Sequence, residues 1–304
     1  MIEVNGLTRT YGGFTAVDDV TFSCEPGRVT GFLGPNGAGK TTTMRIMVGL
    51  TPSSRGTVTI GGLAYADIPN PGRHVGVLLD ASAQHAGRSG REILEVGART
   101  MGLPHSRVDE MLEMVSLTDS EAKRKMRNYS LGMKQRLGLA HALLGDPEVL
   151  ILDEPANGLD PAGIRWMRDL LKGYARRGGT VLLSSHLLHE VEQIADEMVL
   201  IGRGRIVAQG DKQSLLAGNG QASTIAAADD SDALWRAVQR AGLDARPEGD
   251  GFRIAATTAD VGRLALEHQV VLTELRNGAA GLEDLFLELT SDTQREQVTT
   301  GDAA

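Results

Sequence analysis

The sequence predicts an α/β protein with a mostly parallel sheet, a helical insertion, and a second, smaller α/β unit at its C-terminal end. From Val4 to about Ala208, short β-branched runs alternate with helical patterns, as is typical of a parallel sheet covered by helices. Between Arg91 and Leu144 no strand-like run occurs, and apolar residues recur at helical spacing. The turn-forming segment Ala217-Gly218-Asn219-Gly220 then separates the second unit.

The composition is that of a globular protein. The chain has 304 residues, of which 41% are hydrophobic and 23% are charged, which is enough for one large domain and a small one. The first six residues include an acid and no apolar run, so they do not resemble a secretory signal. No stretch approaches the roughly 18 apolar residues that a membrane span requires. We therefore expect a soluble chain that reaches a membrane only by association.

The charge lies in the C-terminal part. Residues 1–219 hold 24 basic and 24 acidic side chains, whereas residues 220–304 hold 7 and 15, which accounts for the net charge of -8. An acidic tail argues against binding to nucleic acid and against a polybasic lipid anchor. The single cysteine, Cys24, excludes an internal disulfide and is expected to be a small buried hydrophobic residue.

The elements of the first unit, residues 1–217, follow from these patterns. Strands are predicted at Val29–Leu33, Val75–Leu79, Val149–Leu152, Val181–Ser184 and Met198–Ile201. The helical insertion, at about residues 91–144, is indicated by Ile93, Leu94, Met111, Leu112, Val115, Leu137 and Leu143.

The second unit, residues 221–290, is predicted to alternate strands and helices. Its strands are expected near Ser223–Ala227, Phe252–Ala255 and Val270–Leu275. Its helices are expected from Asp232 to a stop at Gly242, over Ala259–His268, and around Leu282, Leu285, Phe286 and Leu289. Residues 291–304 are polar and predict a disordered tail.

A glycine-rich loop lies between the strand Val29–Leu33 and the helix expected over Thr42–Val48. It matches the phosphate-binding pattern G-x-x-x-x-G-K-[ST] and, with one further threonine, comprises Gly34, Pro35, Asn36, Gly37, Ala38, Gly39, Lys40, Thr41 and Thr42. Glycines let the backbone wrap phosphates with its N–H groups turned inward, where the helix N-terminus also favours an anion. We expect Lys40 to reach the β- and γ-phosphates of ATP and the Thr41 hydroxyl to ligate Mg²⁺.

Two acidic residues, Asp153 and Glu154, follow the apolar run Val149–Leu152 directly. Such a run predicts a buried strand that presents both carboxylates at its end. We expect Asp153 to hold Mg²⁺, directly or through water, and Glu154 to orient or deprotonate the attacking water. The second carboxylate favours steady hydrolysis of ATP over a switch that only binds the nucleotide.

These two motifs, with three more in the same order, resemble the ATPase subunit of ABC transporters over roughly residues 1–217. The third motif, Tyr129-Ser130-Leu131-Gly132-Met133-Lys134-Gln135-Arg136, resembles the LSGGQ signature of that family and the Gln-Arg that follows it. The resemblance implies that the signature of one subunit covers the ATP held by another. Ser130 can cap the helix Leu131–Leu144, directing its hydroxyl and the helix dipole at a γ-phosphate.

Three more positions match the family. Gly158-Leu159-Asp160 resembles the D-loop that signals between two ATP sites. His186 matches the switch histidine, which contacts the γ-phosphate and the attacking water, and it follows a predicted strand at the end where ligands gather in α/β sheets. Tyr11 lies where the family stacks an aromatic ring on adenine.

The signature departs from the family pattern at two positions. Leu131 replaces its first glycine and Met133 replaces its glutamine. Ser130 and the amide of Gly132 are therefore the residues expected to contact the nucleotide, and the contact is expected to be looser than usual.

The loop after Val75–Leu79 also departs from the family pattern. The position of the family's Q-loop glutamine is Asp80, and Gln84 lies four residues further on. A carboxylate can bind Mg²⁺ or water, which makes Asp80 a candidate metal ligand, but it also repels phosphate. The residues alone leave open whether Asp80 or Gln84 fills this role.

The resemblance implies a function for the whole chain. Two copies are expected to close head-to-tail on two ATP molecules and to energise a membrane exporter whose permease is a separate chain, at the cytoplasmic face of a bacterial membrane. The conformational change is expected to reach the permease through the helical insertion and the loop from Asp80 to Arg88. Among exporters, the chain is most similar to daunorubicin- and bacitracin-resistance ATPases, which implies a drug, antibiotic or lipid-like substrate.

Two other functions fit parts of the sequence. A soluble ABC-type ATPase acting on nucleic acid or ribosomes usually carries two ATPase cassettes or a long coiled-coil insertion, and this sequence has neither. The basic run over residues 123–127 lacks interleaved aromatic residues, so a solvated helix face explains it better than nucleic acid does. A nucleotide-gated module that does not hydrolyse ATP would leave Glu154 idle.

Overall fold

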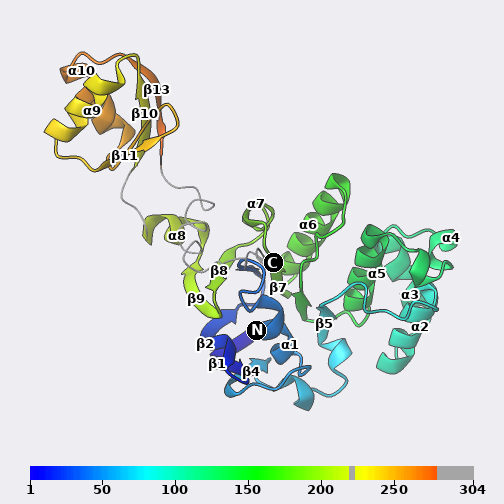
Figure 1. Ribbon diagram of the computed structural model, residues 1–304. Helices are drawn as coiled ribbons and strands as arrows, with labels where there is room; N and C mark the ends of the chain where they lie inside the picture. The colour runs from blue at the N-terminus through cyan, green and yellow to red at the C-terminus, as the bar shows by residue number, and fades with distance from the viewer. Residues whose placement is uncertain (219–222, 279–304) are drawn as a thin grey trace, which may run out of the picture. The chain divides into compact units, whose positions relative to one another are not determined.

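The computed structural model describes residues 1–218 and 223–278, which form two compact units (Figure 1). The first unit spans residues 1–211 and the second begins at Lys212, close to the glycine-rich break that the sequence contains. The predicted last helix and the tail over residues 291–304 lie outside the described residues. Within the described part of the chain, no helix has both the length and the apolar character needed to cross a membrane.

A six-stranded sheet forms the centre of the first unit. Its order is β5-β6-β7-β3-β8-β9, with bounds Val75–Leu78, Val149–Leu152, Thr180–Ser185, Val29–Leu33, Glu197–Gly202 and Arg205–Gly210. Neighbouring strands are parallel except β8 and β9, which pair antiparallel. Every residue of β3, β6 and β7 is buried, as expected for parallel strands covered on both faces. The residues that follow these three strands therefore meet at one edge.

A second, antiparallel sheet in this unit was not predicted from the sequence. It comprises β2 (Phe14–Cys24), β1 (Ile2–Tyr11) and β4 (Arg55–Ile60), in that order. One hydrophobic cluster joins it to the central sheet, and the rings of Phe22 and Phe32 stack across this junction with centroids 5.2 Å apart. Cys24 is fully buried, and its burial raises the pKa of the thiol to about 12.

Helices cover the central sheet and form the insertion. Three of them, α1 (Lys40–Met47), α6 (Pro161–Arg176) and α7 (Leu188–Glu192), follow β3, β6 and β7 along the chain. The insertion contains α2 (Gly90–Met101), α3 (Ser106–Met114), α4 (Asp119–Ala122) and α5 (Leu131–Leu143), which lie together in Figure 1. Capping boxes at Ser89 and Thr118 begin α2 and α4. Short 3₁₀ turns occupy Tyr65–Asp67, Pro71–Arg73 and Met126–Asn128.

The second unit begins with α8 (Lys212–Gly218) and continues in the order strand, helix, strand, strand, helix, strand. These elements are β10 (Thr224–Ala228), α9 (Ser231–Arg240), β11 (Ala245–Glu248), β12 (Gly251–Ile254), α10 (Thr258–Glu267) and β13 (Leu272–Asn277). The sheet order β11-β12-β10-β13, with all pairs antiparallel, is the ferredoxin-like arrangement. The helices α9 and α10 pack on one face of the sheet (Figure 1). The edge strand β11 was not predicted, because it is charged and contains Pro247.

Candidate functional site

The glycine-rich loop connects β3 to α1 and lies at the carboxyl edge of the central sheet. Gly39 has a φ of 110°, and a Cβ atom there would lie 2.7 Å from the carbonyl oxygen of Ala16, so only glycine fits. The Nζ atom of Lys40 donates to the carbonyl oxygen of Gly34 at 2.6 Å, which folds the lysine back over its own loop. The helix α1 begins at Lys40, so its unpaired N–H groups point toward the loop.

A cavity of about 300 Å³ opens beside this loop. It is lined by Phe14, Ala16, Pro35, Asn36, Gly37, Gly39, Lys40, Thr41, Thr42 and Glu154. Of the loop residues expected to bind phosphate, only Gly34 and Ala38 do not line it, and both are buried in the loop itself. The cavity therefore combines a helix N-terminus, a lysine and a carboxylate, which suits an anionic ligand that carries a cation.

Lys40 carries a nearly buried charge. Burial lowers the pKa of its ammonium group, whereas the carboxylates of Glu154 and Asp153 counteract the shift. The Nζ atom lies 3.7 Å from Oε1 of Glu154. A desolvated cation beside a cavity interacts more strongly with a phosphate than an exposed one does, because less water screens it.

Thr41 and Asp153 meet at the same edge of the sheet. The hydroxyl of Thr41 donates to Oδ2 of Asp153 at 2.6 Å, and the Ser184 hydroxyl donates to Oδ1. Among the described residues, no cluster of three or more His, Cys, Asp or Glu side chains could hold a metal ion alone. One carboxylate and one hydroxyl nevertheless fit Mg²⁺, which usually retains waters and takes its other ligands from the phosphates of the substrate.

The carboxylate of Glu154 lies between two basic groups. Its Oε2 atom is 2.9 Å from Nδ1 of His186, and its Oε1 atom faces Lys40. Glu154 and His186 come from the ends of β6 and β7, and the side chains of both are partly exposed. The pair can thus hold a water molecule at the edge of the cavity and share its proton.

The signature residues lie at the start of α5. Ser130 is the N-cap, and its side chain accepts a hydrogen bond from the backbone N–H of Met133. Neither Ser130 nor Gly132 lines the phosphate cavity of its own chain. Gly132 lies against Gly158, because a Cβ atom on Gly132 would be 2.8 Å from the carbonyl oxygen of Gly158.

The segment that resembles a D-loop packs on the start of α5. The side chain of Leu131 occupies the space beside Gly158, where a Cβ atom would lie 2.4 Å from its Cγ. Asp160 caps α6 by accepting a hydrogen bond from the N–H of Gly163 at 2.8 Å. The structure thus brings the signature and the D-loop segment together, apart from the phosphate cavity.

Tyr11 lies at the end of the hairpin between β1 and β2. It pairs with Phe14 across the turn, and the guanidinium carbon of Arg9 lies 4.3 Å from the centroid of its ring. Phe14, not Tyr11, lines the phosphate cavity. Both rings are about half exposed.

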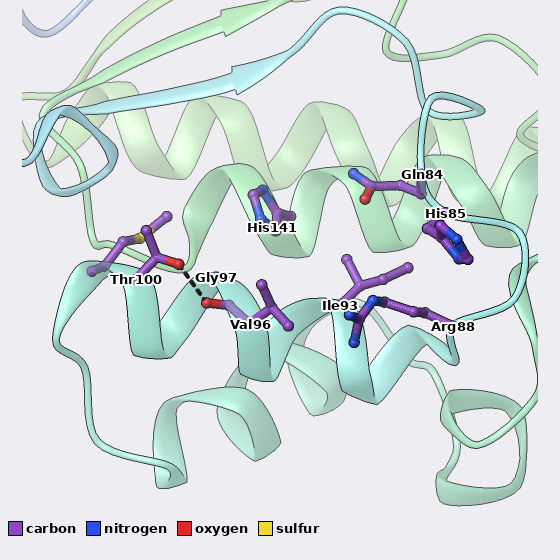
Figure 2. Close-up of a pocket in the computed structure, with 9 residues that line it drawn as sticks. Gln84, His85, Arg88, Ile93, Val96, Gly97, Thr100 and His141 are labelled. Carbon is purple, nitrogen blue, oxygen red and sulfur yellow. Dashed lines mark hydrogen bonds between the residues drawn. The ribbon is translucent and has the colours of Figure 1, made fainter.

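Asp80 and Gln84 have different surroundings in the structure. Oδ1 of Asp80 accepts a hydrogen bond from the N–H of Ser82 at 2.7 Å, which holds the turn after β5. Gln84 lines a second cavity, of about 320 Å³, together with His85, Arg88, Ile93, Val96, Gly97, Thr100, Met101 and His141 (Figure 2). Neither residue lines the phosphate cavity.

The basic run over residues 123–127 is paired in part with acidic residues. Lys123 lies 3.2 Å from Asp119, and Lys125 lies 3.2 Å from Glu92. The paired side chains support a solvated surface, but the prediction of a helix face was wrong, because α4 ends at Ala122 and only the short 3₁₀ turn Met126–Asn128 follows.

Sequence reasoning did not assign three residues at this site. Ser184 contacts both Asp153 and Glu154, Phe14 lines the cavity, and Gln135 was considered only as the end of the signature. Its Nε2 atom donates to the carbonyl oxygen of Glu154 at 2.8 Å. The signal that could have identified Ser184 is its position at the end of a strand, two residues before His186.

The sequence is similar to a known protein family, and to individual proteins over nearly its full length. A family model described as ABC transporter matches residues 17–157. The uncharacterized ABC transporter ATP-binding protein YhcH of Bacillus subtilis (strain 168) is 38% identical over 97% of this chain and 98% of its own. The bacitracin transport ATP-binding protein BcrA of Bacillus licheniformis is 35% identical over 95% of this chain and 97% of its own.

Solved structures share the fold. An ATP-binding subunit of an ABC transporter superposes with a TM-score of 0.66 at 29% identity, covering 72% of this chain and 92% of the other. The ATP-binding cassette MJ0796, solved as a dimer in a post-hydrolysis state with ADP and phosphate, gives a TM-score of 0.62 at 22% identity, over 69% of this chain and 98% of its own. At that identity the likeness to MJ0796 concerns the fold alone.

Proposed function

The chain belongs to the ABC transporter family as an ATP-binding subunit with ATPase activity, and from this premise we propose that it energises an exporter whose permease is a separate chain. The observation that carries the proposal is the arrangement of Lys40, Thr41, Asp153, Glu154 and His186 beside one cavity. Its cargo is a drug, an antibiotic or a lipid-like molecule, as the similarity to a bacitracin transport protein over nearly the full length of both chains suggests.

The residues of the cavity divide the work of hydrolysis. The loop from Gly34 to Thr42 binds the phosphates of ATP through its backbone N–H groups, and Lys40 turns from the carbonyl oxygen of Gly34 to the β- and γ-phosphates. Thr41 and Asp153 would hold Mg²⁺, and Asp80 is a third candidate ligand. The ion would neutralise part of the negative charge that develops on the phosphates during hydrolysis.

Glu154 is the proposed base. Its carboxylate accepts the proton of the attacking water, and His186 orients that carboxylate through its 2.9 Å contact. The hairpin with Tyr11 and Phe14 receives the adenine ring, because both aromatic residues are exposed at its end.

A second copy of the chain completes each site in this proposal. Ser130 and Gly132 stand apart from the phosphate cavity of their own chain, and Ser130 caps the helix α5, whose N-terminal dipole favours an anion. Two chains arranged head-to-tail would bring this helix end to the partner's γ-phosphate, with Asp160 beside it. The two chains close on ATP and reopen after hydrolysis, and this movement drives the transporter.

The movement reaches the permease through the helical insertion. Three segments line the second cavity (Figure 2). The loop from Asp80 to Arg88 contributes Gln84 and Arg88, the helix α2 contributes Val96, and the helix α5 contributes His141. We place the contact with the permease on this surface, at the cytoplasmic face of a bacterial membrane.

Turnover by the purified chain tests the assignment of the base. We expect Glu154→Gln to reduce ATP hydrolysis by about 100-fold or more, since general bases contribute about 10²- to 10⁴-fold. Its affinity for ATP should stay within about threefold of the wild type, because the phosphates are bound by the loop. Undiminished turnover in Glu154→Gln would reject Glu154 as the base.

Co-purification tests the transport role. The tagged chain, expressed in its own host, should be recovered from membranes in a complex with a multi-span membrane protein. Arg88→Glu, on the wall of the second cavity, should weaken recovery without loss of ATP binding. Absence of the chain from membranes at low salt would contradict the proposal.

A further inference from the structure

The backbone of Glu154 has an unfavourable conformation and forms hydrogen bonds with two side chains far away in sequence, donating to Ser184 and accepting from Gln135. We propose that Ser184 and Gln135 are positioning residues that hold this conformation and so aim the Glu154 carboxylate at the attacking water. The inference rests on the proposed role of Glu154 as the base. It gives both residues a part in hydrolysis that they exert through Glu154 and not through contact with the nucleotide.

The conformation of Glu154 requires support. Its φ is 48°, in the left-handed region that disfavours residues with a Cβ atom and that few residues other than glycine, Asn and Asp adopt. Glu154 follows the buried strand β6 directly, so the chain turns sharply at the point where the strand ends. A residue in a disfavoured conformation persists only where the surrounding structure holds it, and such residues concentrate at active sites.

Ser184 supports the N-terminal side of this residue. Its hydroxyl accepts a hydrogen bond from the backbone N–H of Glu154 at 3.0 Å and donates one to Oδ1 of Asp153. A single hydroxyl can make both bonds, because it has one proton and two lone pairs. Ser184 is fully buried in β7, so no water competes for these bonds. One side chain therefore fixes both the proposed metal ligand and the backbone of the proposed base.

Gln135 supports the C-terminal side. Its Nε2 atom donates to the carbonyl oxygen of Glu154 at 2.8 Å, and the N–H of Asn157 donates to the same oxygen at 3.1 Å. The bond from Asn157 closes the local turn, whereas the bond from Gln135 comes from α5 and is the long-range one. Gln135 is 4% exposed, so little water competes for this bond.

The two bonds fix the backbone N–H and the carbonyl group of Glu154, so only its side chain can move in response to a ligand. The fixed backbone confines the carboxylate to the space between Lys40 and His186. Catalysis depends on such confinement, since a displacement of about 1 Å can cost about 100-fold in rate. Because Gln135 lies on α5, the helix that Ser130 caps, a shift of that helix would also change the support of Glu154.

Steady-state ATP hydrolysis by the full chain tests the proposal. Ser184→Ala removes the hydroxyl that makes both bonds, and Gln135→Glu replaces the donor Nε2 with an acceptor oxygen, each with little change of volume. We expect each variant to lower kcat about tenfold or more. The KM for ATP should change by less than about threefold. Ser184→Thr, which keeps the hydroxyl, should restore most of the rate. Ser185→Ala is the matched control, since within residues 1–218 and 223–278 the hydrogen bonds of that hydroxyl are to the backbone of Leu187.

A double-mutant cycle distinguishes positioning from a merely structural role. In a Glu154→Gln background, Ser184→Ala and Gln135→Glu should add less than about twofold to the loss in single-turnover rate, because they act through the carboxylate that is already absent. Full, additive losses in that background would overturn the proposal, as would wild-type kcat in both single variants. Undiminished turnover in Glu154→Gln alone would instead reject the base itself, and this inference with it.

Discussion

The hydroxyl of Thr41 donates a 2.6 Å hydrogen bond to a carboxylate oxygen of Asp153, although 112 residues separate them in sequence. Thr41 lies in the first turn of α1 and Asp153 directly after β6. The hydroxyl and the carboxylate that would hold Mg²⁺ are thus already in contact.

Thr41→Val should weaken the binding of ATP in the presence of Mg²⁺. The loss of a hydrogen bond or ligand at a charged group costs about 1.5–3 kcal/mol, which corresponds to roughly 10- to 100-fold in affinity. The affinity for ATP should be measured once with Mg²⁺ and once with EDTA. Mg²⁺ should increase the affinity of the variant much less than that of the wild type. Thr41→Ser, which keeps the hydroxyl, should behave as the wild type; equal losses in both variants would contradict the role of this oxygen.

Gly158→Ala should destabilise the fold by about 3 kcal/mol. The residue has a φ of 78°, and its Cβ atom would overlap Leu131, so backbone strain and overpacking add. Gly61→Ala is the matched control, since Gly61 also has a positive φ but faces open space, and it should cost only about 1 kcal/mol. Urea unfolding of both variants measures the difference, and equal losses would show that contact with Leu131 is unimportant.

Adding Leu131→Ala to Gly158→Ala should recover part of the lost free energy of unfolding. The smaller side chain removes the overlap but leaves the strained φ. The same double variant reports on the packing of the signature against the D-loop segment. If the free energy of unfolding does not recover, the strained φ of residue 158, and not its contact with Leu131, determines the loss of stability.

His141 should make the stability of the chain depend on pH. Burial lowers its pKa, so that below the ordinary value of about 6.5 the unfolded chain takes up a proton before the folded chain does. Its contribution is therefore present above about pH 6.5 and is lost as the pH falls toward the lowered pKa.

The free energy of unfolding should accordingly fall less between pH 7.5 and pH 5.5 in His141→Gln than in the wild type. The other histidines of the chain, which has seven in all, contribute equally to both proteins. Urea unfolding at several pH values measures this difference. Parallel curves would show that the residue titrates alike in both states.

Asp80 and Gln84 should differ in their effects on the isolated chain. If the Asp80 carboxylate reaches Mg²⁺, Asp80→Asn raises the Mg²⁺ concentration needed for half-maximal hydrolysis, by a few-fold for an exposed ligand. Gln84→Ala should leave that concentration unchanged, because Gln84 lines the second cavity. A shift in Gln84→Ala and none in Asp80→Asn would reverse the assignment.

The central sheet could be predicted from sequence because its strands are continuous apolar runs. All five predicted strands of the first unit form, within one residue at each end, and α5 begins at the residue expected from its cap, Ser130. The antiparallel sheet was missed, since β1 and β2 are long, irregular and only partly buried, so their pattern does not alternate clearly. The edge strand β11 was also missed, because its composition does not favour a strand and it becomes one by pairing with β12.

The sequence by itself determined the family, the α/β fold and the identity of the chemical groups, because phosphate binding and hydrolysis need particular residues at short, recognisable spacings. Only the tertiary structure decided which groups touch. It joined Thr41 to Asp153, placed Phe14 beside the phosphate loop, and set Ser184 and Gln135 on either side of the backbone of Glu154. These contacts depend on the register of parallel strands and on the packing of α5, which arise from the whole core and leave no local pattern in the chain.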